Sequence, residues 1–90
     1  MLRLSATTRF KKDLKLCQKR NYDLNLLYRV VDILRIPSPL PVQNKDHELK
    51  GDYTGKRECH IAPDWLLIYR VENDKLMLDR TETHSDLFKK

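Results

Sequence analysis

The chain has 90 residues, and 18 Lys and Arg outnumber 13 Asp and Glu, which gives a formal net charge of +5 at pH 7. This length favours a single domain over residues 1–90. The longest apolar run, residues 65–69, is far shorter than the roughly 20 residues of a membrane-spanning helix. No apolar targeting segment follows Met1, and the two cysteines lie too far apart for a paired metal motif. We therefore expect a cytoplasmic protein that does not contact a membrane.

Positive charge is concentrated in the first half of the chain. Residues 1–45 hold 10 Lys and Arg against 3 Asp and Glu, whereas residues 46–90 hold 8 against 10. A basic region attracts polyanions such as nucleic acids, and its affinity for them depends on salt. The solvated face of an ordinary amphipathic helix would give the same composition, so charge alone leaves both interpretations open.

The first predicted elements are a short strand and a helix. Leu2 and Leu4 alternate with polar residues, as in a strand with one apolar face. Residues 5–8 then supply capping side chains, and Phe10, Leu14 and Cys17 recur at the spacing of one helix face. The basic residues of this helix should therefore be exposed. They are Arg9, Lys11, Lys12, Lys15, Lys19 and Arg20.

A second helix should follow a break at residues 21–23. Its apolar positions, from Leu27 to Leu34, repeat at the same helical spacing, so the two helices are expected to form a hairpin. Pro37, Pro39 and Pro41 then remove three amide donors, which predicts a stiff extended connector as far as about Asp46.

The hydrophobic period changes from 3.6 to 2 in the second half of the chain. Arg57–Ala62, Trp65–Val71 and Lys75–Glu82 are predicted strands, and the turns between them are short enough for antiparallel hairpins. Thr83 can cap a short C-terminal helical turn. The predicted fold is therefore α+β, in the order β-α-α-β-β-β, with a two-helix hairpin packed on one face of an antiparallel sheet.

All three histidines fall in this second half. The hairpin turn should place His60 near Asp64 and Trp65, and the last strand should return Arg80 and His84 to the same end of the sheet. Imidazoles, a carboxylate and a guanidinium suit cleavage of a phosphodiester, which needs a base, an acid and a cation for the phosphoryl oxygens. The arrangement thus predicts phosphodiester chemistry.

Plainer interpretations exist for each of these residues. A single histidine on a strand is more often structural, and Trp65 and Phe88 are more often packing residues than platforms for bases. The histidines and Asp64 lack the short spacing of a zinc site, and no glycine loop could cradle a phosphate, so we expect no metal and no cofactor. Cys59 should face the opposite side of its strand from His60, which disfavours a thiol nucleophile paired with that histidine.

A family resemblance lies in three segments, DHELKG (46–51), RECHIAPDWLLIY (57–69) and RTETHSDLF (80–88). Together, and with the basic helical hairpin, they resemble the YafQ branch of the RelE/ParE toxin superfamily. The resemblance implies a RelE-like fold and a toxin of a type II toxin–antitoxin system. It also implies a ribosome-dependent endoribonuclease that cleaves mRNA in the A site. The implied partners are the ribosome, mRNA and a DinJ- or RelB-like antitoxin, with operator DNA contacted only through the antitoxin complex.

The resemblance also implies a set of functional residues by their position in these motifs. They are His47, His60, Asp64, His84 and Phe88, with Trp65 and Arg80 as supports. In the implied mechanism Asp64 or His60 is the general base and His84 the general acid. His47 and Arg80 would stabilise the phosphorane, and Phe88 and Trp65 would orient or stack a base. The basic helix would grip ribosomal RNA.

One position departs from the family pattern, which commonly has Gly where this chain has Glu82. A carboxylate pointing inward there would weaken activity. Two alternatives stand beside the interferase: a ParE-like toxin, which shares the fold and acts on DNA gyrase, and a catalytically weak toxin that serves mainly as an antitoxin-bound co-repressor. The gyrase alternative does not call for the histidines and Asp64, whereas Glu82 favours the co-repressor.

Overall fold

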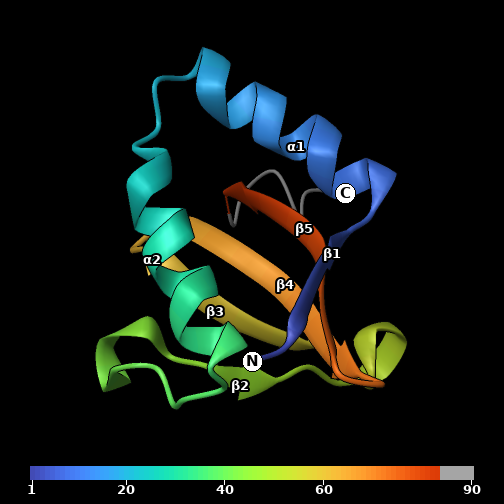
Figure 1. Cartoon of the computed structure of the whole chain (residues 1–90). Coiled ribbons are helices and arrows are strands. Elements are labelled where there is room, and N and C mark those ends of the chain that lie inside the picture. Colours follow the sequence, from blue (N-terminus) through green and yellow to red (C-terminus); the bar gives the residue numbers. More distant parts are fainter. Residues whose placement is uncertain (84–90) are drawn as a thin grey trace.

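A computed structural model describes residues 1–83 of the chain as two helices against one face of a five-stranded sheet (Figure 1). The elements in chain order are β1 (Arg3–Ala6), α1 (Thr8–Lys19), α2 (Leu24–Arg35), the 3-10 turn η1 (Val42–Asn44), β2 (His47–Glu48), the 3-10 turn η2 (Gly51–Tyr53), β3 (Arg57–Ala62), β4 (Trp65–Glu72) and β5 (Lys75–Thr83). The predicted C-terminal helical turn lies outside the described residues, together with His84 and Phe88.

Both helices begin at side-chain caps of the kind expected from the sequence. The Thr7 hydroxyl accepts a hydrogen bond from the Phe10 amide at 3.0 Å, and the Asp23 carboxylate accepts one from the Asn25 amide at 3.0 Å. Between the helices, Asn21 adopts a left-handed conformation with φ 60°. Neither helix is long and apolar enough to cross a membrane, a finding that covers residues 1–83.

The predicted three-stranded meander is confirmed, with β4 and β5 each one residue longer than expected. Asn73 and Asp74 join them with positive φ values of 51° and 65°, the conformation of a two-residue hairpin turn. The full strand order is β1-β5-β4-β3-β2. Two pairings were not predicted: β1 runs parallel to β5, and β2 pairs with β3 inside the segment after the prolines.

The sequence predicted a connector that is extended as far as about Asp46, and this prediction is wrong for its second half. Residues 42–44 form the 3-10 turn η1, and Lys45 follows it in a left-handed conformation. The Asn44 side chain donates to the His60 carbonyl at 2.7 Å, which anchors this turn to β3. Residues 47 and 48 then enter the sheet, because the anchored turn brings them alongside β3.

The central strand β4 is covered on both faces. Leu67 and Tyr69 belong to the main core beneath the helices, together with Leu27 of α2. Leu66 and Ile68 lie on the opposite face, where side chains from the segment between β2 and β3 pack over them. The apolar run of β4 therefore fits a strand that is buried on both sides.

We predict that the helix-facing core carries most of the stability. Leu27 is 1% exposed, whereas its neighbour Leu26 is 36% exposed. Leu27→Ala should lower the free energy of unfolding by about 2–5 kcal/mol, because it removes buried methyl groups and leaves a cavity. Leu26→Ala is the matched control, and urea unfolding of both variants measures the difference. Equal losses would mean that α2 does not pack as described.

Candidate active site

A row of polar side chains crosses the face of the sheet that points away from the helices. His47 of β2 is in register with Glu58 of β3, and Glu58 is in register with Ile68 of β4. Ile68 in turn is in register with Arg80 of β5. Residues in register project to the same face of a sheet. Ile68 lies on the face that points away from the helices, so His47, Glu58 and the base of the Arg80 side chain lie on that face too.

His47 and Glu58 form a pair that can hold a proton. The Nδ1 atom of His47 lies 2.7 Å from the Lys45 carbonyl oxygen, and its Nε2 atom lies 3.5 Å from Glu58 Oε1. A carbonyl only accepts, so Nδ1 carries the hydrogen of this contact and Nε2 is the ring nitrogen that faces Glu58. The Glu58 side chain is only 8% exposed, which places its carboxylate in a position to stabilise protonated His47.

Glu58 is the site residue that the sequence analysis missed. It has the same parity on β3 as His60, so both side chains project to the face opposite Cys59. That parity was the available signal. Residue type alone does not mark Glu58, because a glutamate on a strand is usually a surface residue.

His60 lies further along the same face, in register with Leu66. Its side chain is half-buried and lines a hollow of about 450 Å³ together with Gln43, Asn44 and Pro63. A hollow of this size falls within the range that holds small ligands. His60 therefore combines a titratable ring with space for a reacting group.

Arg80 is held by a buried carboxylate at the edge of the sheet. Its Nε atom donates to Asp13 Oδ2 at 2.8 Å, and its Nη2 atom donates to Asp13 Oδ1 at 3.4 Å. Asp13 also accepts the Thr81 backbone amide at 3.1 Å. Since β1 pairs with β5 only as far as residue 78, α1 runs beside the remaining edge and Asp13 takes up the amide there (Figure 1).

Glu82 forms a second ion pair with the same guanidinium, through its Oε1 atom and Arg80 Nη2. Burial raises the pKa of Glu82, the nearby Asp13 carboxylate raises it further, and Arg80 opposes both effects. The carboxylate that the sequence analysis singled out thus points at Arg80.

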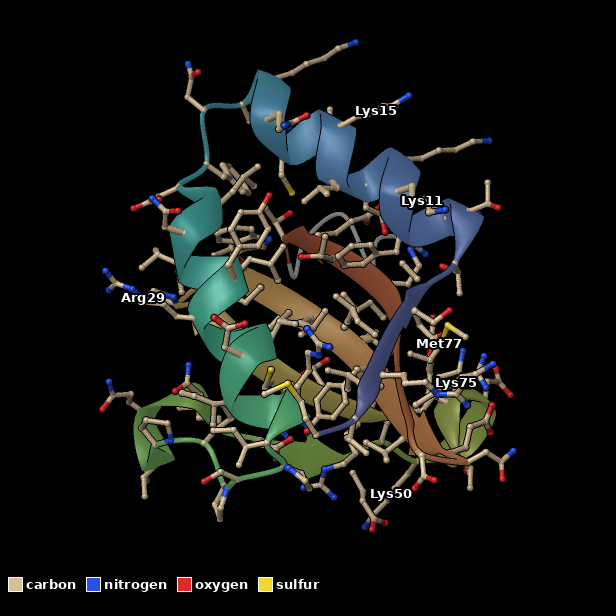
Figure 2. All side chains as sticks on the ribbon, viewed as in Figure 1. Lys11, Lys15, Arg29, Lys50, Lys75 and Met77 are labelled. Atoms are coloured by element: carbon tan, nitrogen blue, oxygen red, sulfur yellow. The ribbon has the colours of Figure 1, made fainter. Side chains whose placement is uncertain are left out.

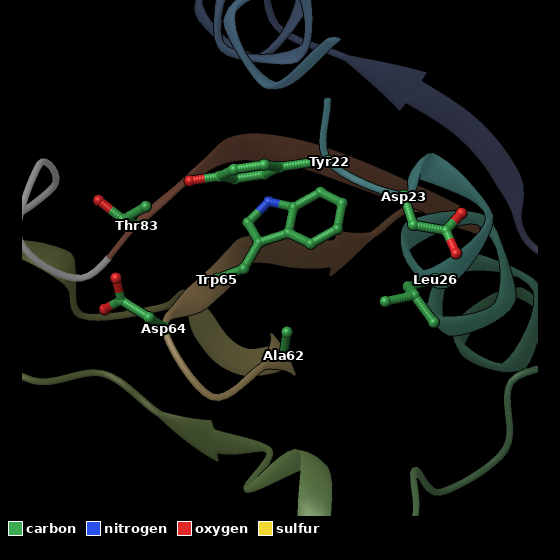
Figure 3. Close-up of a pocket in the computed structure, with 7 residues that line it drawn as sticks. All are labelled: Tyr22, Asp23, Leu26, Ala62, Asp64, Trp65 and Thr83. Atoms are coloured by element: carbon green, nitrogen blue, oxygen red, sulfur yellow. The ribbon is translucent and has the colours of Figure 1, made fainter. Parts of the chain in front are cut away.

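Trp65 and Asp64 lie away from the polar row. The Trp65 side chain belongs to the core beneath the helices, is 5% exposed, and donates from Nε1 to Thr81 Oγ1 at 2.8 Å. Its ring packs edge-on against Tyr22, with centroids 5.0 Å apart (Figure 3). Asp64 lies in the turn after β3 and lines the pocket beside that ring. The expected common patch is therefore divided between the two faces of the sheet.

A second charged cluster resembles the one around Arg80. Arg70 of β4 donates from Nε to Asp79 Oδ2 at 3.1 Å, and its Nη1 atom pairs with Glu72. The Asp79 side chain is 5% exposed, and Lys56 Nζ lies 3.8 Å from it. Each of these arginines therefore has one buried aspartate and one glutamate two residues further along its strand.

The basic residues predicted on the first helix are all exposed. They are Arg9, Lys11, Lys12, Lys15, Lys19 and Arg20. Lys11 and Lys15 extend away from the body of the protein (Figure 2). The cations of α1 itself, from Arg9 to Lys19, therefore lie on a solvent-facing surface that a polyanion can reach.

Cys59 is unsuited to nucleophilic chemistry. Its side chain is 0% exposed and lies in the core beneath the helices, on the opposite face from His60. Burial raises the pKa of the Cys59 thiol to about 12, with smaller contributions from Asp46 and Glu58. The thiolate is therefore absent near neutral pH. Within residues 1–83, no three or more His, Cys, Asp and Glu side chains are grouped so that they could hold a metal ion.

Comparison with known proteins identifies the family. A family model described as the bacterial toxin of a type II toxin–antitoxin system, YafQ, matches residues 2–89. The chain belongs to the YafQ family. The expected resemblance is confirmed, and so is the predicted α+β fold of this family.

Relatives with sequence and structural similarity agree with this assignment. The mRNA interferase toxin YafQ of Escherichia coli strain K12 is 44% identical over 80 residues, which are 88% of this chain and 87% of that protein. A crystal structure of YafQ from E. coli strain BL21(DE3) has a TM-score of 0.91 at 38% identity, covering 98% of this chain and 99% of that one. A copper-bound mutant toxin from Helicobacter pylori has a TM-score of 0.94 at 42% identity, covering 98% and 100%.

The raised pKa of Cys59 predicts a loss of stability at alkaline pH. The folded state holds this proton up to about pH 12, whereas the unfolded state releases it near its ordinary value of 9.0. The protonated Cys59 thiol therefore makes its full contribution to the free energy of unfolding below pH 9. That contribution falls by roughly 2 kcal/mol between pH 8 and pH 10.5. Urea unfolding at both pH values should show a smaller fall for Cys59→Ala than for the wild type. An identical fall in both proteins would contradict the prediction.

Asp13 should be the most important acidic residue for stability. Asp13→Ala leaves the Thr81 amide and Arg80 without this partner, which should lower the free energy of unfolding by about 3–5 kcal/mol. Asp32→Ala is the matched control, because Asp32 is an exposed helical aspartate on α2, and its loss should stay within about 0.5 kcal/mol. Urea unfolding at pH 7 compares the two. Similar losses would show that the edge of β5 does not depend on Asp13.

Proposed function

We propose that this YafQ-family protein is an mRNA interferase toxin, a ribosome-dependent endoribonuclease that cleaves mRNA in the A site. The family assignment supports the activity, since E. coli relatives bear the name mRNA interferase toxin. The observation that carries the proposal is the shared face of the sheet on which His47, Glu58, His60 and the start of the Arg80 side chain lie. These groups supply a base, a proton-holding pair and a cation for a phosphate.

The proposed reaction uses the 2′-hydroxyl of the RNA itself as nucleophile. A general base removes the 2′-proton as the 2′-oxygen attacks the adjacent phosphorus. The bond from phosphorus to the 5′-oxygen breaks, and a general acid protonates that oxygen. The products are a 2′,3′-cyclic phosphate, which water can open to a 3′-phosphate, and a 5′-hydroxyl. Because the nucleophile belongs to the substrate, the attack needs no metal-activated water.

The described geometry supports His60 rather than Asp64 as the general base. His60 lies on the same face as Arg80, whereas Asp64 lies in the turn beside the buried Trp65 ring. His47 would stabilise charge that grows on the phosphoryl oxygens by donating from Nε2 to the phosphate in place of its 3.5 Å contact with Glu58 Oε1. His84 as general acid and Phe88 as the residue that orients a base stay predictions.

The proposed partners follow from charge and from the relatives. The exposed cations of α1 would bind ribosomal RNA. A crystal structure of the E. coli DinJ–YafQ toxin–antitoxin complex has a TM-score of 0.88 at 40% identity, covering 98% of this chain and 99% of that one. We therefore propose a cognate antitoxin for this protein, with operator DNA contacted only through the antitoxin complex. Ribosomes and mRNA would place the activity in the cytoplasm.

The co-repressor alternative has one specific observation in its favour. Two carboxylates, those of Asp13 and Glu82, face the guanidinium of Arg80 that the interferase would offer to a phosphate. A toxin with this arginine permanently occupied would bind its antitoxin without cleaving RNA. The gyrase alternative gains nothing from the family assignment, which is to YafQ.

The test is cleavage of mRNA on translating ribosomes by purified toxin. His60→Ala should lower the single-turnover rate by roughly 10²–10⁴-fold, the usual size of general base catalysis, while ribosome binding and melting temperature stay near wild type. Glu48→Gln is the control, because Glu48 is an exposed titratable residue on β2 that faces the other side from His47. Its rate should remain within about twofold of wild type.

The result also decides among the alternatives. A well-folded wild-type protein that binds ribosomes without cleaving mRNA would overturn the interferase and favour the co-repressor. A His60→Ala protein with full activity would remove His60 from the mechanism. The toxin should be dialysed against a chelator before the assay, and only magnesium should then be added back. This step tests whether cleavage depends on a transition metal, because a structurally similar H. pylori mutant toxin binds copper.

A further inference from the structure

Arg80 is the cation of the candidate site, and its guanidinium is already occupied by two carboxylates. We propose that Glu82 is an internal competitor for the RNA phosphate at Arg80, so that it sets the affinity of the site for its substrate. This inference rests on the proposed function in one respect, namely that Arg80 contacts a phosphate. It makes Glu82 a residue that determines how strongly RNA is bound.

The contacts identify Glu82, rather than Asp13, as the partner that a phosphate would displace. Asp13 is tied down from two directions, by Arg80 Nε at 2.8 Å and by the Thr81 amide at 3.1 Å, and it is 5% exposed. Glu82 contacts only Nη2, which Asp13 Oδ1 also reaches at 3.4 Å, and its side chain is 15% exposed. Asp13 therefore positions the guanidinium, whereas Glu82 is the more exposed and less anchored of its two carboxylate partners.

The charges point the same way. Asp13, Glu82 and Arg80 together carry one net negative charge when all three are ionised, so the cluster repels a phosphate. Neutralising Glu82 makes the cluster neutral, which leaves Arg80 able to form a charge-assisted hydrogen bond with a phosphate oxygen. A like charge about 6 Å away changes an affinity by roughly 3-fold in water and roughly 100-fold at the effective dielectric of a protein surface.

The chain contains a matched control for this effect. Arg70 has a buried aspartate at its Nε atom, Asp79 Oδ2 at 3.1 Å, and Glu72 at its Nη1 atom. Glu72 also follows its arginine by two positions, as Glu82 does. Glu72→Gln thus removes the same charge from the same kind of arginine–glutamate pair, and neither Arg70 nor Glu72 belongs to the candidate site.

The first measurement is the dependence of mRNA cleavage on the concentration of programmed ribosomes. Glu82→Gln should lower KM by roughly 10-fold, within the limits set by the two dielectric values, and leave kcat within about twofold. Glu82→Asp, which keeps the charge, should stay near wild type, and so should Glu72→Gln. In an Arg80→Ala background the effect of Glu82→Gln should fall to the roughly 3-fold that like-charge repulsion leaves in water, because the competition itself requires the guanidinium. An unchanged KM for Glu82→Gln would overturn the proposal, as would an equal change in Glu72→Gln.

The second measurement does not depend on catalysis. Inorganic phosphate is titrated into the purified chain while the Arg80 Nε–H resonance is followed by NMR, with melting curves to show that each variant is folded. Glu82→Gln should bind phosphate at Arg80 roughly 10-fold more tightly than wild type, and Glu72→Gln should not. If no variant cleaves mRNA but this difference appears, the proposed function fails and the competition stands. If cleavage occurs and phosphate affinity is the same in wild type and Glu82→Gln, the competition is wrong and the proposed function stands.

Discussion

The carboxylate of Asp13 joins helix α1 to strand β5, and the rest of the structure depends on this contact. It accepts the Thr81 amide at the edge of β5 and the guanidinium of Arg80, while its own helix supplies part of the core. An unpaired edge amide and a half-buried arginine are both costly, and one buried acid satisfies both. The position of α1, the end of the sheet and the cation of the candidate site are therefore set by the same contact.

Local patterns in the sequence were enough for most of the fold. The caps at Thr7 and Asp23 and the helical spacing of apolar residues predict α1 and α2, because these signals act within a few residues. The same holds for β3 to β5, which are joined by short turns. The pairing of β1 with β5 connects residues 3–6 with residues 75–78, and no local pattern specifies a partner at that distance. The two-residue strand β2 is too short to show any period.

The candidate site was only partly predictable for a related reason. The histidines stand out by residue type, whereas Asp13 looks like an ordinary surface residue among the lysines of an amphipathic helix. Glu58 acquires its place only when β2 lies beside β3 and brings His47 to it. For Trp65 the family motif implies contact with a base and residue type favours packing, and the structure packs its indole against Tyr22 and bonds its nitrogen to Thr81. Tertiary neighbours decide the environment of each of these side chains.

The pairing of β1 with β5 also bears on the timing of folding during synthesis. The first strand to leave the ribosome finds its partner only when residues 75–78 have been added and have cleared the exit tunnel. The same late strand carries Arg80 and Thr81, so Asp13 waits for them on a helix made much earlier. Contacts between such distant segments close slowly. A nascent chain therefore cannot complete the cation of its candidate site until residues 75–81 have left the ribosome.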